Sequence, residues 1–168
     1  MSHDFPAPVY AETVLAPNFE YAQKHFLDAL IAIHYAHTRM LARQRILTAE
    51  EERRLIAALD ALDRPRIAAE KFSGKCEDLF YLIEARIEQA AGADVAGKMH
   101  TARSRNDIAI TLFRMTARRE VLLTVRSFGA LRSVVLDLAD RHTETVMPAH
   151  THTQPAQPTT LAHYVVFG

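Results

Sequence analysis

The stretch that decides the fold is NDIAITLFRMTARREVLLTVRSFGALRSVVLDLADRH, residues 106–142. It holds no proline and one glycine, Gly129, and aliphatic residues recur along it as a broken apolar stripe. This pattern predicts a single helix. At 1.5 Å per residue, about 36 residues span roughly 54 Å, which is far longer than a compact domain of this size requires. The helix is therefore expected to be the spine of a larger helical bundle or part of a coiled coil.

Shorter helices are predicted before this stretch. Apolar residues recur at steps of three and four over about 18–45, which predicts an amphipathic helix. Thr48 and Glu51 have the spacing of a capping box at the start of a second helix, which Pro65 ends or interrupts. Residues 77–92 predict a third helix, with a glycine as its stop.

The two ends of the chain differ from this helical pattern. Residues 1–17 hold three prolines and are expected to form an extended arm. The last residues, 158–168, predict the first turns of a helix too short to be stable alone, so we expect the chain to be the N-terminal part of something longer or one piece of a split protein. No alternating pattern of useful length predicts strands. The expected fold is all-α or nearly so, with an N-terminal helical domain over 1–105 and the start of a helical bundle over 106–168.

Composition limits the classes of partner. The 20 basic and 20 acidic residues cancel, so no global attraction to nucleic acid or anionic membrane is implied. The single cysteine, Cys76, excludes an intramolecular disulfide and is typical of a reducing compartment. The first ten residues lack the apolar run of a signal peptide, and no apolar run approaches the ~20 residues of a membrane span. These features predict a soluble, cytoplasmic protein with neither nucleic-acid nor membrane partners.

The stretch GKMHTARSRND, residues 97–107, places a dense polar cluster at the entrance of the long helix. A helix N-terminus favours anions, and Arg105 adds a planar, bidentate donor suited to a carboxylate. Asn106 can donate a hydrogen bond without adding charge. The functional interpretation is a carboxylate-binding loop. The alternative, a capped helix start with two solvated arginines, stays open at this point.

The stretch MPAHTHTQPAQPTTLAH, residues 147–163, predicts a loop stiffened by prolines. A metal site needs three or four ligands, and His150 and His152 supply at most two. His142, His163 and Glu144 have no recognisable ligand spacing, so no metal is expected. His150 is interpreted as a surface or subunit-contact residue. A proton-transfer role is open for His152, because imidazole titrates near neutrality.

Together, these two stretches strongly resemble the first two signature regions of argininosuccinate lyase, a family of the fumarase/aspartase superfamily. HYAHTRMLARQRILTAEE, residues 34–51, also resembles that family's N-terminal helix and the turn after it. The resemblance implies homotetramers built around long helices, with each active site combining regions from three subunits. It also implies a β-elimination that releases fumarate from a small substrate and requires no cofactor. The proton removed lies beside a carboxylate, so the site must stabilise an aci-carboxylate with positioned donors.

Roles for individual residues follow from the same resemblance. Thr151 is implied to hydrogen-bond the substrate, and His152 to assist proton transfer. His150 stands where relatives carry other residues, so its role stays open. The implied substrate-binding residues are His100, Ser104, Arg105, Asn106 and Gln157.

The sequence departs from the family pattern in three places. The third signature region, a Gly-Ser-Ser loop that carries the proton-abstracting serine, is absent from these 168 residues, which implies that the chain alone is inactive. LIAIH, residues 30–34, replaces an Asp-x-x-Gly-Ser run and puts His34 at the serine position. EDLFYLIE, residues 77–84, replaces EDVHxNIE, with Phe80 for histidine and Leu82 for asparagine.

The last two departures remove polar groups expected near the amine-bearing half of the substrate. A buried polar substrate group left unpaired costs roughly 1–3 kcal/mol. We therefore expect the full-length enzyme to eliminate a different amine from an N-substituted aspartate. The alternatives are an authentic argininosuccinate lyase of arginine biosynthesis and a non-catalytic relative, since lens crystallins have been recruited from this family.

Overall fold

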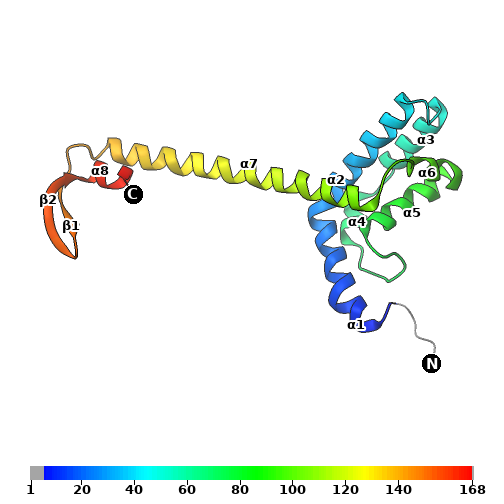
Figure 1. Cartoon of the computed structure of the whole chain (residues 1–168), viewed down its shortest axis with the longest axis horizontal. Helices are drawn as coiled ribbons and strands as arrows, with labels where there is room; N and C mark the ends of the chain where they lie inside the picture. The colour runs from blue at the N-terminus through cyan, green and yellow to red at the C-terminus, as the bar shows by residue number, and fades with distance from the viewer. Residues whose placement is uncertain (1–5, 168) are drawn as a thin grey trace. The chain divides into compact units, whose positions relative to one another are not determined.

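The computed structural model describes residues 6–167, and Figure 1 names its elements in chain order. The chain divides into two compact units, one extending through Ala117 and the other beginning at Arg118. The elements of the first unit are α1 (Pro8–Tyr10), a π-helical segment (Ala11–Leu15), α2 (Ala16–Arg43), α3 (Ala49–Asp60), α4 (Arg64–Ala69), α5 (Leu79–Ala91) and α6 (Ala93–Met99). The 36-residue helix α7 (Arg105–Asp140) runs through the boundary, and β1 (Val146–Thr151), β2 (Gln154–Thr160) and α8 (Leu161–Phe167) follow it.

The N-terminal arm is helical, so the prediction of an extended arm is wrong for the part after Ala7; residues 1–5 of that arm lie outside the described residues. Pro8 lies in the first turn of α1, and Pro17 lies in the first turn of α2. Pro8 breaks no helical hydrogen bond, because the N–H groups of a first turn have no partner within the helix. Pro17 instead follows the π-helical segment, whose backbone continues into α2. The π-helical segment joins the two helices, and the Ala16 N–H donates to the carbonyl of Ala11. Proline count alone therefore misidentified this segment.

Helix ends in the first unit follow the local signals. Thr48 and Glu51 form both hydrogen bonds of the predicted capping box at the start of α3. The Asp78 side chain accepts from the Tyr81 N–H and begins α5, which ends at Gly92 with a φ of +85°. A left-handed residue at this position favours glycine. The capping box and the glycine stop are confirmed, whereas α4 and α6 were not predicted.

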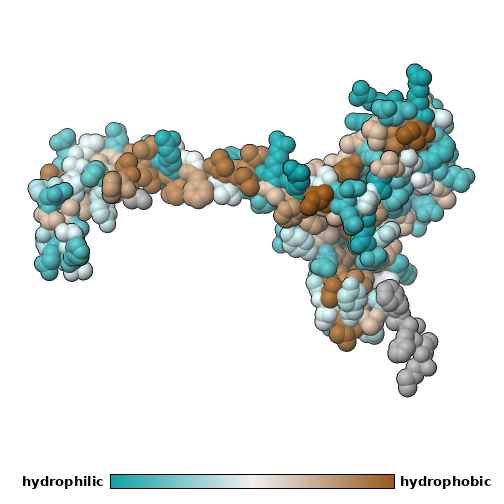
Figure 2. Space-filling model, viewed as in Figure 1, coloured by the Kyte–Doolittle hydropathy of each residue, from teal (hydrophilic) through white to brown (hydrophobic). Residues whose placement is uncertain are grey.

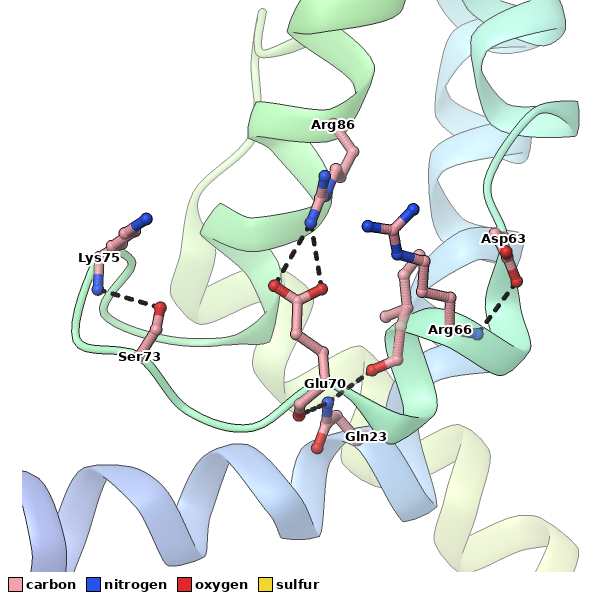
Figure 3. A network of polar contacts seen from close by, with 8 residues as sticks. Gln23, Asp63, Arg66, Glu70, Ser73, Lys75 and Arg86 are labelled. Atoms are coloured by element: carbon pink, nitrogen blue, oxygen red, sulfur yellow. Dashed lines mark hydrogen bonds and ion pairs between the residues drawn. The ribbon is translucent and has the colours of Figure 1, made fainter.

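The core of the first unit lies between α2, α3 and α5 and continues onto the start of α7. Its fully buried aliphatic side chains include Leu30, Ile31, Leu41, Leu55, Leu59, Ile83 and Ile87. A polar network fixes α4 against this core (Figure 3). The buried amide of Gln23 on α2 donates to the carbonyls of Ile67 (2.6 Å) and Glu70 (2.7 Å), and Arg86 on α5 donates to the Glu70 carboxylate at 3.1 Å. These bonds satisfy the carbonyls at the end of α4.

The second unit contains a two-stranded antiparallel hairpin where the sequence predicted only a loop. The Thr160 hydroxyl accepts from the His163 N–H and caps α8, the short helix that the sequence predicted. The Leu161 N–H donates to the carbonyl of Thr145 at 2.9 Å, which ties α8 to the segment after α7. The predominantly helical fold and the long helix are confirmed, with this hairpin as the one sheet among residues 6–167.

Helix α7 carries many apolar side chains that are exposed in the part of the chain that the structure describes. The exposed ones are Ile110, Phe113, Met115, Val121, Leu122, Leu123, Val125, Phe128, Leu131, Val134 and Leu136. Figure 2 shows the resulting apolar surface along α7. Exposed contiguous apolar surface of this kind marks an interaction surface. Among residues 6–167, every helix is too short or too polar to cross a lipid bilayer.

Candidate active site

Ser104 caps the start of α7. The Ser104 hydroxyl accepts from the Asn106 N–H at 3.2 Å, and the Ile108 N–H donates to the Ser104 carbonyl at 3.1 Å. The Ser104 side chain is therefore engaged in a hydrogen bond with the backbone at the start of the helix. The Asn106 side chain is exposed beside it. Of these two predicted substrate contacts, Asn106 therefore has the side chain that is more accessible to a ligand.

Arg105 begins α7 and is held by the start of α5. Its guanidinium lies 2.9 Å from the Glu77 carboxylate, 3.4 Å from the Asp78 carboxylate and 5.7 Å from the centre of the Tyr81 ring. The hydrogen bond that Arg105 donates to the Glu77 carboxylate is the main reason that the pKa of Arg105 is raised. The side chain is still 42% exposed, so one face of the guanidinium remains open to a ligand. A substrate carboxylate would join or displace Glu77.

A pocket of about 260 Å³ opens beside Arg105 and Asn106, between α2, α5 and α7. Its polar lining residues are Asn18, Asp78, Arg105 and Asn106. Its apolar lining residues are Ala22, Phe26, Leu30, Leu79, Phe80, Ile108, Ala109 and Leu112. The pocket thus joins a polar rim to an apolar interior. Leu30 and Phe80, which replace polar residues of the family pattern, both lie in it.

Arg103 is buried, which corrects the alternative of two solvated arginines. Its side chain is 5% exposed, and its guanidinium donates to the His34 Nδ1 at 2.9 Å and to the Glu84 carboxylate. It also lies 5.7 Å from the centre of the Phe80 ring. Burial lowers the pKa of Arg103, and Glu84 opposes that effect. Sequence reasoning missed this role, because nothing in the spacing distinguishes a buried arginine from a solvated one.

His34 is the most perturbed histidine in the first unit. It is fully buried on α2, and its ring stacks on Phe80 with a 6.1 Å separation of ring centres. Burial, followed by the charge of Arg103, lowers its pKa to about 3, so the ring is neutral. Because Nδ1 accepts from Arg103, the ring proton resides on Nε2. His34 therefore serves as a buried hydrogen-bond acceptor.

His100, a predicted substrate contact, lies at the end of α6. Its Nδ1 is 3.3 Å from the Glu84 carboxylate, the same group that pairs with Arg103. The neighbouring loop is tied to α2 as well, since His37 Nε2 lies 3.0 Å from the Thr101 carbonyl. These contacts hold the 97–107 loop against α2 and α5. His100 thus lies with the network that positions the loop.

The tip of the hairpin carries the two predicted catalytic residues. Thr151 ends β1, and His152 and Thr153 form the two-residue turn with φ of +50° and +63°. Two positive φ values are the signature of a type I′ turn, which favours Asn-Gly and penalises a β-branched residue. The Thr151 hydroxyl lies 3.0 Å from His152 Nδ1. A histidine and a threonine held in this conformation suggest selection for function over hairpin stability.

Gln157 lies at an irregularity of the same hairpin. Pro148 pairs with Pro158 and His150 pairs with Pro155, so Ala149 alone faces residues 156–157. This two-against-one register is a β-bulge, which re-aims the side chain of the bulged residue. Paired prolines have no N–H to donate, so they occupy a position that needs no ladder hydrogen bond. Within residues 6–167, no cluster of three or more His, Cys, Asp or Glu side chains is arranged to hold a metal ion.

The predicted site residues thus fall into two groups. His100, Ser104, Arg105 and Asn106 gather in the first unit, around the entrance of α7. Thr151, His152 and Gln157 gather on the hairpin of the second unit. Each group is internally organised by the contacts described above.

Comparison with known proteins identifies the family. The sequence profile of a family described as Lyase matches residues 20–167. The chain belongs to this lyase family. Argininosuccinate lyase 2 of Agrobacterium fabrum (strain C58) is 43% identical over 162 residues, which cover 96% of this chain and 32% of that protein. Argininosuccinate lyase of Methanosarcina acetivorans is 44% identical over 138 residues, which cover 82% of this chain and 28% of that protein.

Solved lyase structures share the fold. EDDS lyase in complex with formate is similar with a TM-score of 0.74 and 34% identity, over 96% of this chain and 31% of that chain. A fumarate lyase from Mesorhizobium sp. BNC1 has a TM-score of 0.70 at 20% identity, over 90% of this chain and 36% of that chain, and supports the fold alone. The chain therefore spans about a third of the length of these relatives. Membership of the fumarase/aspartase superfamily, with likeness to argininosuccinate lyase, is confirmed.

Proposed function

We propose that the full-length protein is a C–N lyase that releases fumarate from an N-substituted aspartate by β-elimination. The observation that carries the proposal is the pairing of Arg105 and Asn106 at the polar rim of a pocket in a chain of the lyase family. In this reaction a base removes the proton beside one carboxylate. Its electron pair becomes the new C=C bond, and the C–N bond breaks to release the amine. A variant of the similar EDDS lyase has been solved with bound fumarate.

Every predicted site residue except His100 has a part in this proposal. Arg105 and Asn106 bind the substrate carboxylate and stabilise the aci-carboxylate, and Ser104 holds their backbone at the helix start. Thr151 binds substrate, and Gln157 adds a polar contact. His152 moves a proton through Nε2, since its Nδ1 faces the Thr151 hydroxyl at 3.0 Å. We propose that the serine that starts the reaction belongs to a signature region outside residues 1–168, so that these residues alone are not expected to catalyse the elimination.

The proposal includes an oligomer, because α7 exposes many large apolar side chains. We expect long helices of several chains to pack around α7 and to bring hairpin and loop from different chains to one site, as in a homotetramer. Light scattering should report a tetramer for the full-length protein. Phe128→Glu, which places a charge on the exposed α7 surface, should lower that mass, and Arg118→Glu at a polar position of α7 serves as the control. A monomeric active enzyme would contradict the assembly.

The chemistry is tested by following the ultraviolet absorbance of fumarate. The full-length protein is expected to release fumarate from N-substituted aspartates, with no added cofactor, and to act poorly on argininosuccinate. Asn106→Ala should lower kcat by roughly 10²–10³, the effect of removing one donor to a developing oxyanion. Efficient turnover of argininosuccinate would instead establish an authentic argininosuccinate lyase of arginine biosynthesis. Fumarate release from none of these compounds would favour a non-catalytic relative. A cytoplasmic location is part of the same proposal.

A further inference from the structure

The pocket beside Arg105 combines a rim for an anion with an interior for a hydrocarbon. Arg105 and Asn106 lie on its rim, whereas Phe26, Leu30 and Phe80 lie among its apolar lining residues. A ligand that places a carboxylate at the rim extends its remaining part into this interior. For an N-substituted aspartate, that part is the substituent on nitrogen. The pocket is therefore matched to the group that leaves with the amine.

The charges around the pocket exclude a cationic substituent. Among the described residues that line it, Asp78 is the one carboxylate. Both of its oxygens are engaged, since Oδ1 accepts from the Tyr81 N–H at 3.1 Å and Oδ2 lies 3.4 Å from Arg105. A guanidinium or a second ammonium in the pocket would remain unpaired in an apolar surrounding, which is strongly unfavourable. The arginine half of argininosuccinate would meet this penalty.

The size of the pocket sets the size of the substituent. A dry apolar cavity of about 150 Å³ accommodates benzene. The pocket here measures about 260 Å³, so it accepts a benzene ring with a short linker or an alkyl chain of similar bulk. Larger polyamine or amino-acid substituents would extend past the rim. Size and polarity thus point to the same class of leaving group.

We propose that this pocket selects a monoamine with an apolar substituent, such as an aryl-alkyl amine or a short alkyl amine, as the leaving group. The inference rests on the proposed C–N lyase function and names its substrate class. Leu30 and Phe80 are the specificity-determining residues, because they supply hydrocarbon between the carboxylate-binding rim and the core. Neither residue takes part in the proton transfer.

The reverse reaction gives a sharp test with the full-length enzyme. An amine's lone pair forms the C–N bond with fumarate, the π electron pair forms a C–H bond with a proton, and the nitrogen loses a proton, so no oxidant or reductant is needed. Pentylamine and 1,5-diaminopentane form a matched pair that differs by one terminal ammonium. We expect kcat/KM to be at least about tenfold higher for pentylamine. Phenethylamine should react as well as pentylamine.

A variant supplies the missing carboxylate without disturbing the core. Ala109 lines the pocket at an exposed position of α7, so Ala109→Asp should fold and should shift the preference toward 1,5-diaminopentane by at least about tenfold. Thr111→Asp adds the same charge at an exposed position of α7 outside the pocket and should leave the preference unchanged. Both results together support the inference.

Other outcomes distinguish a failure of this inference from a failure of the proposed C–N lyase function. If the enzyme adds amines to fumarate but uses 1,5-diaminopentane or arginine as well as or better than pentylamine, the selection for an apolar substituent is overturned and the lyase function stands. An equal shift in the Ala109→Asp and Thr111→Asp variants would also overturn it, because the effect would then be one of general charge. No addition of any amine, with no fumarate released from any N-substituted aspartate, would overturn both proposals.

Discussion

Acid is expected to destabilise the first unit through His34. The ring is fully buried, and the guanidinium of Arg103 donates to its Nδ1 at 2.9 Å. Burial is the main cause that lowers its pKa from 6.5 to about 3, and the charges of Arg103, His37 and His100 add to the effect. Protonation would place a second cation against Arg103, which Glu84 alone cannot neutralise.

The size of the effect follows from linkage between protonation and folding. Between pH 6.5 and about pH 3, the unfolded chain binds a proton at this residue and the folded chain does not. Stability from His34 is therefore complete above the unfolded pKa and falls as the pH decreases below it. One proton corresponds to about 1.4 kcal/mol per pH unit, so the free energy of unfolding should lose about 3 kcal/mol between pH 6.5 and roughly pH 4.

The measurement is urea unfolding of the chain, followed by helical circular dichroism at several pH values in that range. His34→Gln keeps a hydrogen-bond acceptor for Arg103 but does not titrate. As the pH decreases, its free energy of unfolding should therefore fall by about 1.4 kcal/mol per pH unit less than that of the wild type. His150→Gln removes an exposed imidazole from the hairpin and should keep the wild-type slope. Equal slopes for wild type and His34→Gln would refute the reasoning, as would an NMR titration in which His34 protonates near pH 6.5.

Three further substitutions test local features of the fold. Thr48→Ala removes the side-chain hydrogen bond of the capping box, in which the Thr48 hydroxyl accepts from the Glu51 N–H, and should lower the free energy of unfolding by about 1 kcal/mol in urea. Gly92→Ala should cost at least about 1 kcal/mol in the same assay, because φ is +85° and the new Cβ would lie 3.1 Å from the Arg54 guanidinium; an unchanged midpoint would argue against both strain and contact. Thr153→Gly should stabilise the hairpin by about 1 kcal/mol, since its φ of +63° suits glycine. Slower amide hydrogen exchange in β1 and β2 would report that gain, and faster exchange would contradict it.

Local chemistry made much of the fold predictable from sequence. The capping box at Thr48 and the stop at Gly92 depend on residues a few positions apart, so both could be found without tertiary information. The long helix was predictable because residues 106–142 contain no proline and keep one apolar pattern throughout. Pro8 and Pro17 led to a wrong prediction, because Pro8 lies in a first turn, where a proline is compatible with a helix, and Pro17 follows a π-helical segment. Their effect depends on where the helix begins.

The hairpin was not predictable, because its sequence argues against strands. His152 and Thr153 replace the Asn-Gly or Asp-Gly pair that normally signals a type I′ turn. Three prolines lie in its two strands, where they are usually depleted. The same irregularities fall at residues proposed to act in catalysis. Sequence-level rules fail most often where function sets the conformation.

The candidate site divides in the same way. Ser104, Arg105 and Asn106 were predictable because a helix entrance and a bidentate donor are local features. The role of Arg103 was not predictable, because its burial depends on His34 and Glu84, which lie 69 and 19 positions away in the chain. The sequence shows that position 103 is an arginine but not whether its side chain is buried. Its solvation is decided by tertiary packing.

Two departures from the family pattern that look independent in sequence are one contact in space. His34 stands at a serine position and Phe80 at a histidine position, and their rings stack on each other beside Arg103. In this chain α2 supplies the imidazole beside Arg103. Reverting one position alone leaves Arg103 with no imidazole acceptor or with two imidazoles to accommodate. The two substitutions should therefore be strongly coupled.

A double-mutant cycle measures this coupling. His34→Ser removes the acceptor of Arg103, and Phe80→His buries a second polar ring, so each single variant should lose stability in urea. The double variant restores a single imidazole and should be more stable than the sum of the two losses predicts, by about 1 kcal/mol or more. Losses that add to within about 0.5 kcal/mol would show that the positions act independently. Coupling of the expected sign would mean that the polar group was moved between α2 and α5 while the arginine was retained, and that the apolar face of Phe80 in the pocket is a consequence of that exchange.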